Sequence, residues 1–218
     1  MPDAMAFDPE CRRCPRLASH LDEVRRCYPE YHARPVAPFG SSRPSLLIVG
    51  LAPGMHGANA TGRPFTGDHA GILLYKSLFV CGFSNRPEAR SRNDGLVLNE
   101  CRITNAVKCL PPKNKPTATE IKTCNRYLKT ELAMLRPGAV ILALGAIAHT
   151  AVVRALGLRR KHYPFGHGSC YALGDAGWLL DAYHCSRYNT QTGRLTEEEF
   201  LQVLWHARAL LRRSKLST

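Results

Sequence analysis

Ser45-Leu-Leu-Ile-Val-Gly50 is a short, continuous apolar run that ends at a glycine. Such a run is typical of a strand that is buried on both faces of a parallel sheet. Three more runs of this kind follow along the chain, at residues 102–107, 139–144 and 178–183. We therefore expect parallel strands whose carboxyl ends meet at one edge of the sheet, where α/β proteins bind their ligands.

Helical patterns lie between and after these runs. Thr117 and Glu120 form a capping-box pair, which predicts the start of a helix that ends near residue 135. A second capping-box pair, Thr196 and Glu199, predicts the start of a C-terminal helix. Asp8-Pro9 predicts the start of an N-terminal helix over residues 8–27, and helices are also expected at 72–80 and 146–156. Strands that alternate with helices predict a single α/β domain, over residues 1–218, with helices on both faces of the sheet.

The charge of the chain points to a polyanionic partner. Lys and Arg number 30 against 17 Asp and Glu, a formal net charge of +13. Nucleic acid is the usual partner of such a chain, and a basic surface kept for solubility is the alternative. No apolar run approaches the roughly 20 residues of a membrane helix, and no signal peptide is recognisable, so we expect a cytoplasmic protein without a membrane partner.

Nine cysteines in a cytoplasmic protein are expected to be reduced, so some can be metal ligands. Cys11-x-x-Cys14 lies near one end, and Cys109 and Cys124, with fourteen residues between them, lie in mid-chain. Together they could form a four-thiolate site for zinc or an iron–sulfur cluster. The alternative is unrelated thiols. The other five are interpreted as core or incidental residues: Cys27, Cys81, Cys101, Cys170 and Cys185.

Three loops, at residues 51–68, 108–116 and 184–195, follow the first, second and fourth strands and are the most unusual segments of the chain. Residues 50–68 contain five glycines, which suggests a backbone that approaches a ligand closely. The segment lacks the Gly-Lys-Ser/Thr ending of a Walker A loop, and it does not match the Gly-x-Gly-x-x-Gly pattern of a dinucleotide-binding loop.

These loops resemble motifs of the family 5 uracil-DNA glycosylases, with family 4 as the nearer cousin. The segments that carry the resemblance are Gly50-Leu-Ala-Pro-Gly54, Gly62-Arg-Pro-Phe-Thr-Gly-Asp68, Thr104-Asn-Ala-Val-Lys-Cys109 and His184-Cys-Ser186. The sequence departs from many members of the superfamily in having Cys185 and Arg187 where prolines are common. It also lacks a polar side chain at 51–53, which is a trait of family 5 and leaves the water-activating group open.

The resemblance implies a three-layer αβα sandwich around a four-stranded parallel sheet. It further implies one 4Fe–4S cluster bound by Cys11, Cys14, Cys109 and Cys124. The N-terminal helix at 8–27 would be a cluster-binding helix, because it carries the first two of these ligands. The implied partner is double-stranded DNA with damaged bases, and single-stranded DNA as a further candidate. We expect a monomer associated with the nucleoid.

The same resemblance assigns roles to the residues of the loops. Hydrolysis of a base–sugar bond builds negative charge on the base and positive charge on the sugar. His184 would donate a hydrogen bond to the base oxygen, and Asp68 would stabilise the sugar cation or position water, unless it only caps a helix. The expected substrate-binding residues are Phe65, which would stack on the base, Asn105, which would pair with its edge, and Ala52 and Gly54. His56 and Asn59 are weaker polar candidates.

Contacts with DNA are expected from the same three loops. Residues expected to wedge into the duplex are Arg187, Tyr188 and Gln191. Cations expected to meet phosphates are Lys108 and Arg63, together with Lys113, Lys115 and Arg194.

No lysine suggests itself as a nucleophile, so we expect a monofunctional enzyme. The resemblance implies uracil as the substrate, and also deaminated purines such as hypoxanthine and xanthine. The alternatives are a non-catalytic iron–sulfur protein that binds DNA and a structural zinc module.

Overall fold

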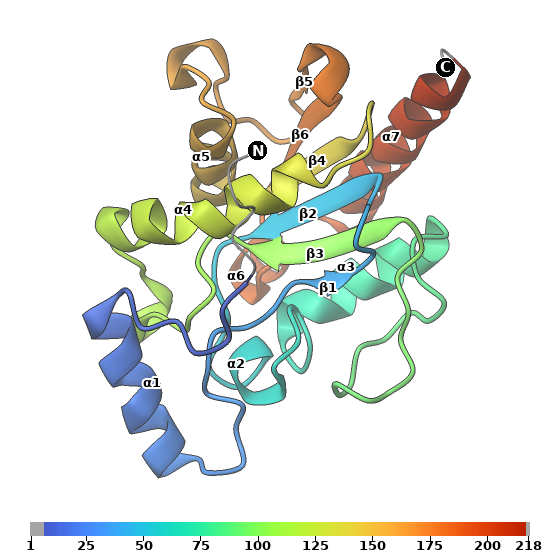
Figure 1. Cartoon of the computed structure of the whole chain (residues 1–218). Coiled ribbons are helices and arrows are strands. Elements are labelled where there is room, and N and C mark those ends of the chain that lie inside the picture. The colour runs from blue at the N-terminus through green and yellow to red at the C-terminus, as the bar shows by residue number, and fades with distance from the viewer. Residues whose placement is uncertain (1–6, 217–218) are drawn as a thin grey trace.

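The computed structural model describes residues 7–216, and within them one six-stranded sheet has the order β1-β3-β2-β4-β6-β5 (Figure 1). Its four inner strands are parallel and correspond to the predicted apolar runs: β2 Leu46–Gly50, β3 Cys101–Asn105, β4 Val140–Leu144 and β6 Trp178–Ala182. The edge strands, β1 Phe39–Gly40 and β5 Cys170–Ala172, pair antiparallel with β3 and β6. The expected sheet of four strands is therefore corrected to six.

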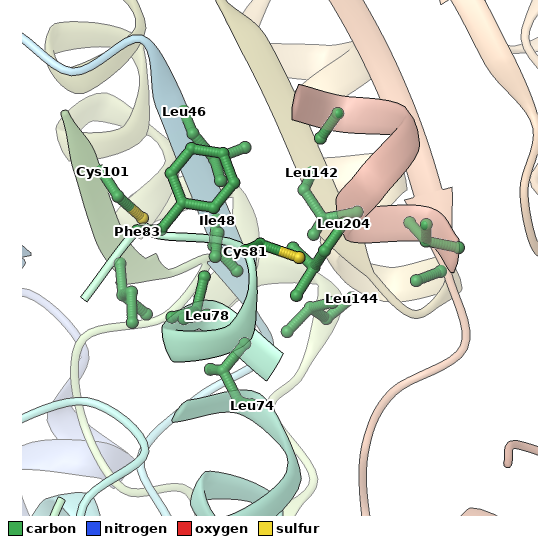
Figure 2. Close-up of a cluster of buried hydrophobic side chains, with 14 of the residues drawn as sticks. Leu46, Ile48, Leu74, Leu78, Cys81, Phe83, Cys101, Leu142, Leu144 and Leu204 are labelled. Carbon is green, nitrogen blue, oxygen red and sulfur yellow. The ribbon is translucent and has the colours of Figure 1, made fainter. Parts of the chain in front are cut away.

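The sheet is covered by helices on both faces, as predicted, which gives three layers (Figure 1). Leu46 and Ile48 of β2 pack in one cluster, and Leu47 and Val49 pack in another, because side chains alternate across a strand. The helices α3 His69–Val80 and α7 Glu197–Leu216 cover the first face. Figure 2 shows Leu74, Leu78 and Leu204 of these helices beside the strand leucines. The helices α4 Ala118–Ala133 and α5 Ala146–Ala155 cover the second face.

Both predicted capping boxes are present. Thr117 accepts a hydrogen bond from the Glu120 backbone N–H at 3.2 Å, and the Glu120 carboxylate accepts from the Thr117 N–H at 2.7 Å. Thr196 and Glu199 make the corresponding pair of bonds at 3.1 and 2.8 Å. These reciprocal bonds satisfy backbone donors that the first helical turn leaves unpaired, so α4 and α7 begin where the sequence predicts.

The N-terminal helix begins later than predicted. Helix α1 spans Pro15–Cys27 with Cys14 as its N-cap residue, and not residues 8–27. The Asp8 side chain accepts a hydrogen bond from the Glu10 N–H at 2.9 Å, in a turn that precedes the helix. Proline fits the first helical position at 15 because its missing N–H needs no partner there. Cys11 and Cys14 therefore precede the helix and do not lie within it.

Two short helices lie inside segments expected to be loops: α2 Ala58–Thr61 and α6 Arg187–Gln191. Single 3-10 turns occur at Pro112–Asn114, Arg160–His162 and Gly174–Ala176. No helix in the described part of the chain is long and apolar enough to cross a membrane.

Candidate active site and cysteine cavity

A cavity of about 440 Å³ lies at the carboxyl ends of the parallel strands. The structure brings together around it all of the residues predicted to act on the base: Ala52, Gly54, Phe65, Asp68, Asn105 and His184. Asn105 is the last residue of β3, and His184 follows the end of β6 by two residues. The predicted loops therefore meet at one edge because parallel strands all end there.

Phe65 is held beside His184 by an unusual backbone. The two rings are stacked, with centroids 5.7 Å apart and planes inclined by 28°. Phe65 has a φ of 53°, in the left-handed region that side chains seldom adopt. A Cβ on Gly50 would lie 2.7 Å from the Phe65 ring, and a Cβ on Gly71 would lie 1.9 Å from its carbonyl oxygen. Glycine at both positions is thus what makes room for Phe65.

Asn105 presents an acceptor that has no partner. Its side chain is 4% exposed, and its Oδ1 makes no hydrogen bond within the described residues. A buried polar atom without a partner costs about 1–3 kcal/mol. A ligand in the cavity that offers an N–H to this oxygen would remove that cost.

His184 is held in its neutral form. Burial lowers its pKa to about 4, so the imidazole is uncharged at neutral pH. Its backbone carbonyl accepts a hydrogen bond from the Asn189 side chain at 2.7 Å, which ties the residue to α6. A neutral imidazole can still donate one hydrogen bond to an atom in the cavity.

Asp68 is both a helix cap and a cavity residue. Its Oδ1 accepts the Gly71 N–H at 2.9 Å and so caps α3. Its Oδ2 faces the first loop, where a Cβ on Gly57 would lie 2.5 Å away. Burial raises the pKa of this carboxyl group, although the Gly71 and Ala70 N–H groups oppose the rise. Among the described residues that line the cavity, Asp68 is the one carboxylate.

The predicted wedge residues lie on α6 at the rim of the cavity. Arg187 lines the cavity, Tyr188 is 69% exposed, and Gln191 is exposed to solvent. All three are free to meet a large ligand, and their contact with DNA stays a prediction.

Two predicted phosphate contacts are wrong, because the side chains are buried in ion pairs. Lys108 is 1% exposed, and its Nζ donates to Glu131 Oε1 at 2.7 Å and to the Asn105 carbonyl at 2.9 Å. Arg63 is 3% exposed, and its Nη2 donates to Asp94 Oδ2 at 2.6 Å. The other candidate cations, Lys113, Lys115 and Arg194, are exposed.

The cavity also includes polar residues that the sequence did not single out: His69, Asn114 and Ser186. His69 contacts the Thr190 hydroxyl at 3.0 Å. Asn114 has a φ of 55°, and asparagine after Pro-Pro-Lys is a turn signal that could have identified it. The weaker candidates His56 and Asn59 are not among the cavity residues, and His56 contacts the Tyr31 hydroxyl at 2.8 Å.

A second, smaller cavity lies between the segment before α1 and helix α4. The four predicted ligands line it, and the other five cysteines do not: Cys11, Cys14, Cys109 and Cys124. Cys109 and Cys124 are each 8% exposed, and the Lys108 N–H donates to the Cys124 sulfur at 3.3 Å. Within residues 7–216, no group of three or more His, Cys, Asp or Glu is placed so that it could hold a metal ion. The four thiols therefore line one common space.

Comparison with known proteins matches residues 37–208 to the model of the family described as the uracil DNA glycosylase superfamily. The chain is 48% identical, over 92% of its length and 93% of the relative's, to the type-5 uracil-DNA glycosylase of Thermus thermophilus. It is 46% identical to the type-5 enzyme of Pyrobaculum aerophilum, over 91% of this chain and 88% of the relative. It is 29% identical to the type-4 uracil-DNA glycosylase of Saccharolobus solfataricus, over 84% of this chain and 82% of the relative.

Proposed function

Because the chain belongs to the uracil-DNA glycosylase superfamily, we propose that it hydrolyses the bond between uracil and deoxyribose in DNA and leaves an abasic site. The observation that carries the proposal is the cavity at the sheet edge. It combines an unpaired amide oxygen on Asn105, a neutral His184 and the Phe65 ring. These are the groups needed to pair with, polarise and stack on a flipped base.

In this mechanism the base leaves the stack and enters the cavity. The N3–H of uracil donates to Asn105 Oδ1, and the base lies against Phe65. His184 donates a hydrogen bond to the uracil oxygen on which negative charge develops as the glycosidic bond breaks. Asp68 stabilises the positive charge on the sugar or orients the attacking water. The proton of that water passes to solvent or to Asp68, and no covalent enzyme intermediate forms.

We also propose that deaminated purines such as hypoxanthine and xanthine are substrates. The first-motif residues that line the cavity, Leu51, Ala52 and Gly54, carry no polar side chain. A pocket becomes selective when a wrong base would leave buried polar groups of the pocket without hydrogen-bond partners. This wall has no polar side chain, so it does not require one particular pattern of donors and acceptors on the base.

We further propose that the cysteine cavity binds one 4Fe–4S cluster. Four thiols with no fifth cysteine around one enclosed space suit the four-thiolate ligation of such a cluster. A zinc ion would need sulfurs about 2.3 Å from one centre, so metal analysis of the purified protein separates zinc from the cluster. When bound, the cluster would tie the segment before α1 to α4.

The proposed partners are double-stranded and single-stranded DNA. The formal charge of +13 supports both, and we propose that the protein acts as a monomer on DNA of the nucleoid.

The test is abasic-site formation on duplexes and single strands that contain uracil, hypoxanthine or xanthine, under single-turnover conditions. We expect alkali-labile strands from the uracil substrate and, more slowly or equally, from the purine substrates, with no strand cleavage before alkali. Binding of these DNAs without base release would overturn the catalytic proposal and favour a DNA-binding protein.

A further inference from the structure

A basic groove is lined by residues of α4 together with Arg154 of α5 and Arg13, and it shares no lining residue with the base cavity. Figure 1 shows α4 and α5 side by side on one face of the sheet. Five cations line it, namely Arg13, Lys122, Arg126, Lys129 and Arg154, with Thr119, Thr123 and Asn125 between them. No carboxylate lines it within the described residues. We propose that this groove, which we call the α4 groove, binds the phosphate backbone of DNA that flanks the damaged base. This inference rests on the proposed action on DNA.

The arrangement of α4 explains why the groove is uniformly positive. Thr119, Lys122, Thr123, Arg126 and Lys129 recur at helical spacing and share one face of the helix. The two carboxylates of α4 bond elsewhere: Glu120 pairs with Arg16 and Glu131 pairs with buried Lys108. The cations of α4 that line the groove therefore share one face of the helix, whereas its two carboxylates are paired outside the groove.

The groove cations are not used by the fold. None of the five forms an ion pair within residues 7–216, although the chain holds eleven described pairs elsewhere. The Arg126 Nη1 is buried and has no hydrogen-bond partner among the described residues. Five like charges around one groove repel each other in the free protein, and an anionic ligand would relieve that repulsion.

A short segment of chain connects the groove to the base cavity. Helix α4 begins just after the loop that carries Asn114, a residue of the base cavity. From Thr119 to Lys129 the helix rises about 15 Å, which corresponds to about four phosphates of one strand at 3.4 Å of duplex axis each. A polyanion that already enters the base cavity is therefore the occupant that this placement favours over an acidic protein.

The four-cysteine cavity adjoins the groove, because Arg13 and Thr123 line both. Arg13 lies between Cys11 and Cys14 and would be positioned by their ligation. A loaded cysteine site would thus hold Arg13 in the part of the groove that adjoins the four-cysteine cavity.

The test compares two variants with equal charge. The groove variant is Lys122→Gln with Lys129→Gln, and the control is Arg43→Gln with Arg212→Gln, which removes two exposed cations outside the groove. Binding of each variant to an undamaged 30-base-pair duplex is measured against salt concentration. The measurement does not depend on base release, so a failure of the proposed catalysis would leave it interpretable.

We expect the groove variant to lose affinity on the order of tenfold or more at ~0.1 M salt, with a log–log salt slope shallower by up to about 1.8. The control should keep most of the wild-type affinity and slope. Equal losses in the two variants would show that only overall charge matters and would overturn the proposal. Unchanged binding of the groove variant would overturn it as well.

Discussion

Single residues of the base cavity are expected to divide the work of binding and chemistry. His184 and Asp68 would act mainly as charge develops, whereas Asn105 would act on the base before and during reaction. His184→Ala should lower the single-turnover rate of uracil release on the order of 100-fold, as for other lost donors to a developing oxyanion. Asp68→Asn should lower it comparably, and both variants should bind damaged DNA nearly as the wild type does.

Asn105→Ala should differ in its dependence on the base. It should reduce release of uracil more than release of a purine that contacts the cavity in another way. Circular dichroism checks folding, and His56→Ala is the matched control, since His56 contacts Tyr31 outside the cavity. A folded His184→Ala variant that cuts uracil DNA at the wild-type rate would show that the assignment is wrong. If only Asp68→Asn is unaffected, water held by backbone groups becomes the better account.

The pH dependence of the rate follows from the same two residues. His184, with a pKa of about 4, is neutral throughout the range from pH 5 to 8. The Asp68 pKa is raised above its usual value, and the carboxylate is lost as pH falls through it. The single-turnover rate should therefore fall, not rise, as the pH is lowered and Asp68 becomes protonated. Asp68→Asn should flatten the acid limb, whereas a rate that increases toward pH 5 would indicate a protonated His184.

The position of the base cavity could be predicted from the loops at the carboxyl ends of the parallel strands, and the resemblance to family 5 supplied the roles of the residues that line it. Residue types did not distinguish free cations from buried ones. Lys108 pairs with Glu131, 23 residues away, and Arg63 pairs with Asp94, 31 residues away. No local sequence pattern predicts either ion pair. His69 was missed for the same reason, since its partner Thr190 is 121 residues distant.

At the scale of elements, Asp94 anchors the loop that carries Phe65 and Asp68. Its carboxylate accepts two bonds from Arg63, at 2.9 and 2.6 Å, and others from the N–H groups of Arg90 and Leu96. Asp94→Ala would leave the buried Arg63 charge unpaired, and breaking such pairs costs about 3–5 kcal/mol. We expect a loss of that order in the free energy of unfolding, measured by denaturant titration.

The control for Asp94→Ala lies in the segment between α3 and β3, which also carries Asp94. Glu88→Ala breaks an exposed pair with Arg90, and exposed pairs contribute at most about 1 kcal/mol. If the two variants are equally stable, the Arg63–Asp94 pair does not hold the loop in place.

The cysteine cavity lies between helix α4 and the segment before α1, and its four thiols lead to a prediction about metal content. The wild-type protein should be brown and contain close to four irons per chain, as one 4Fe–4S cluster requires. Cys124→Ser should lose iron and colour and should be less soluble. Cys27→Ser is the control, because Cys27 is exposed and outside the cavity. A colourless wild-type protein that holds stoichiometric zinc would contradict the prediction.

The elements themselves were predictable where their patterns are long. The four inner strands are runs of apolar residues, and α4 and α7 carry capping boxes. Strands β1 and β5 have two and three residues, too few for a recognisable alternation. The start of α1 was predicted too early because Asp8 is a preferred N-cap residue followed by proline. The observed N-cap, Cys14, makes no side-chain cap hydrogen bond, and Arg16 in the first turn pairs with Glu120 of α4.

At the scale of the whole molecule, the excess of positive charge determines how the protein meets DNA. The formal net charge of +13 remains whatever ion pairs the fold contains. Exposed cations carry part of it, namely Lys113, Lys115 and Arg194 together with Lys122 and Lys129 of the α4 groove. Binding to phosphates releases condensed counterions, so affinity depends on salt more than on sequence. Undamaged DNA should therefore bind, and it should bind in a strongly salt-dependent way.

Binding of undamaged duplex should weaken along a straight log–log line, with a slope of about −0.9 for each phosphate contacted, and single strands should give about −0.7. Fluorescence anisotropy over a series of salt concentrations measures both slopes. A duplex that contains an abasic site should give nearly the same slope and a higher affinity, because the extra contacts in the base cavity are not ionic. Matching slopes would show that the ionic contacts are made by the exposed surface and not by the base cavity, since salt screens only interactions between exposed charges. Salt-insensitive binding to undamaged duplex would mean that the positive charge serves solubility, and that recognition of DNA begins at the damaged base alone.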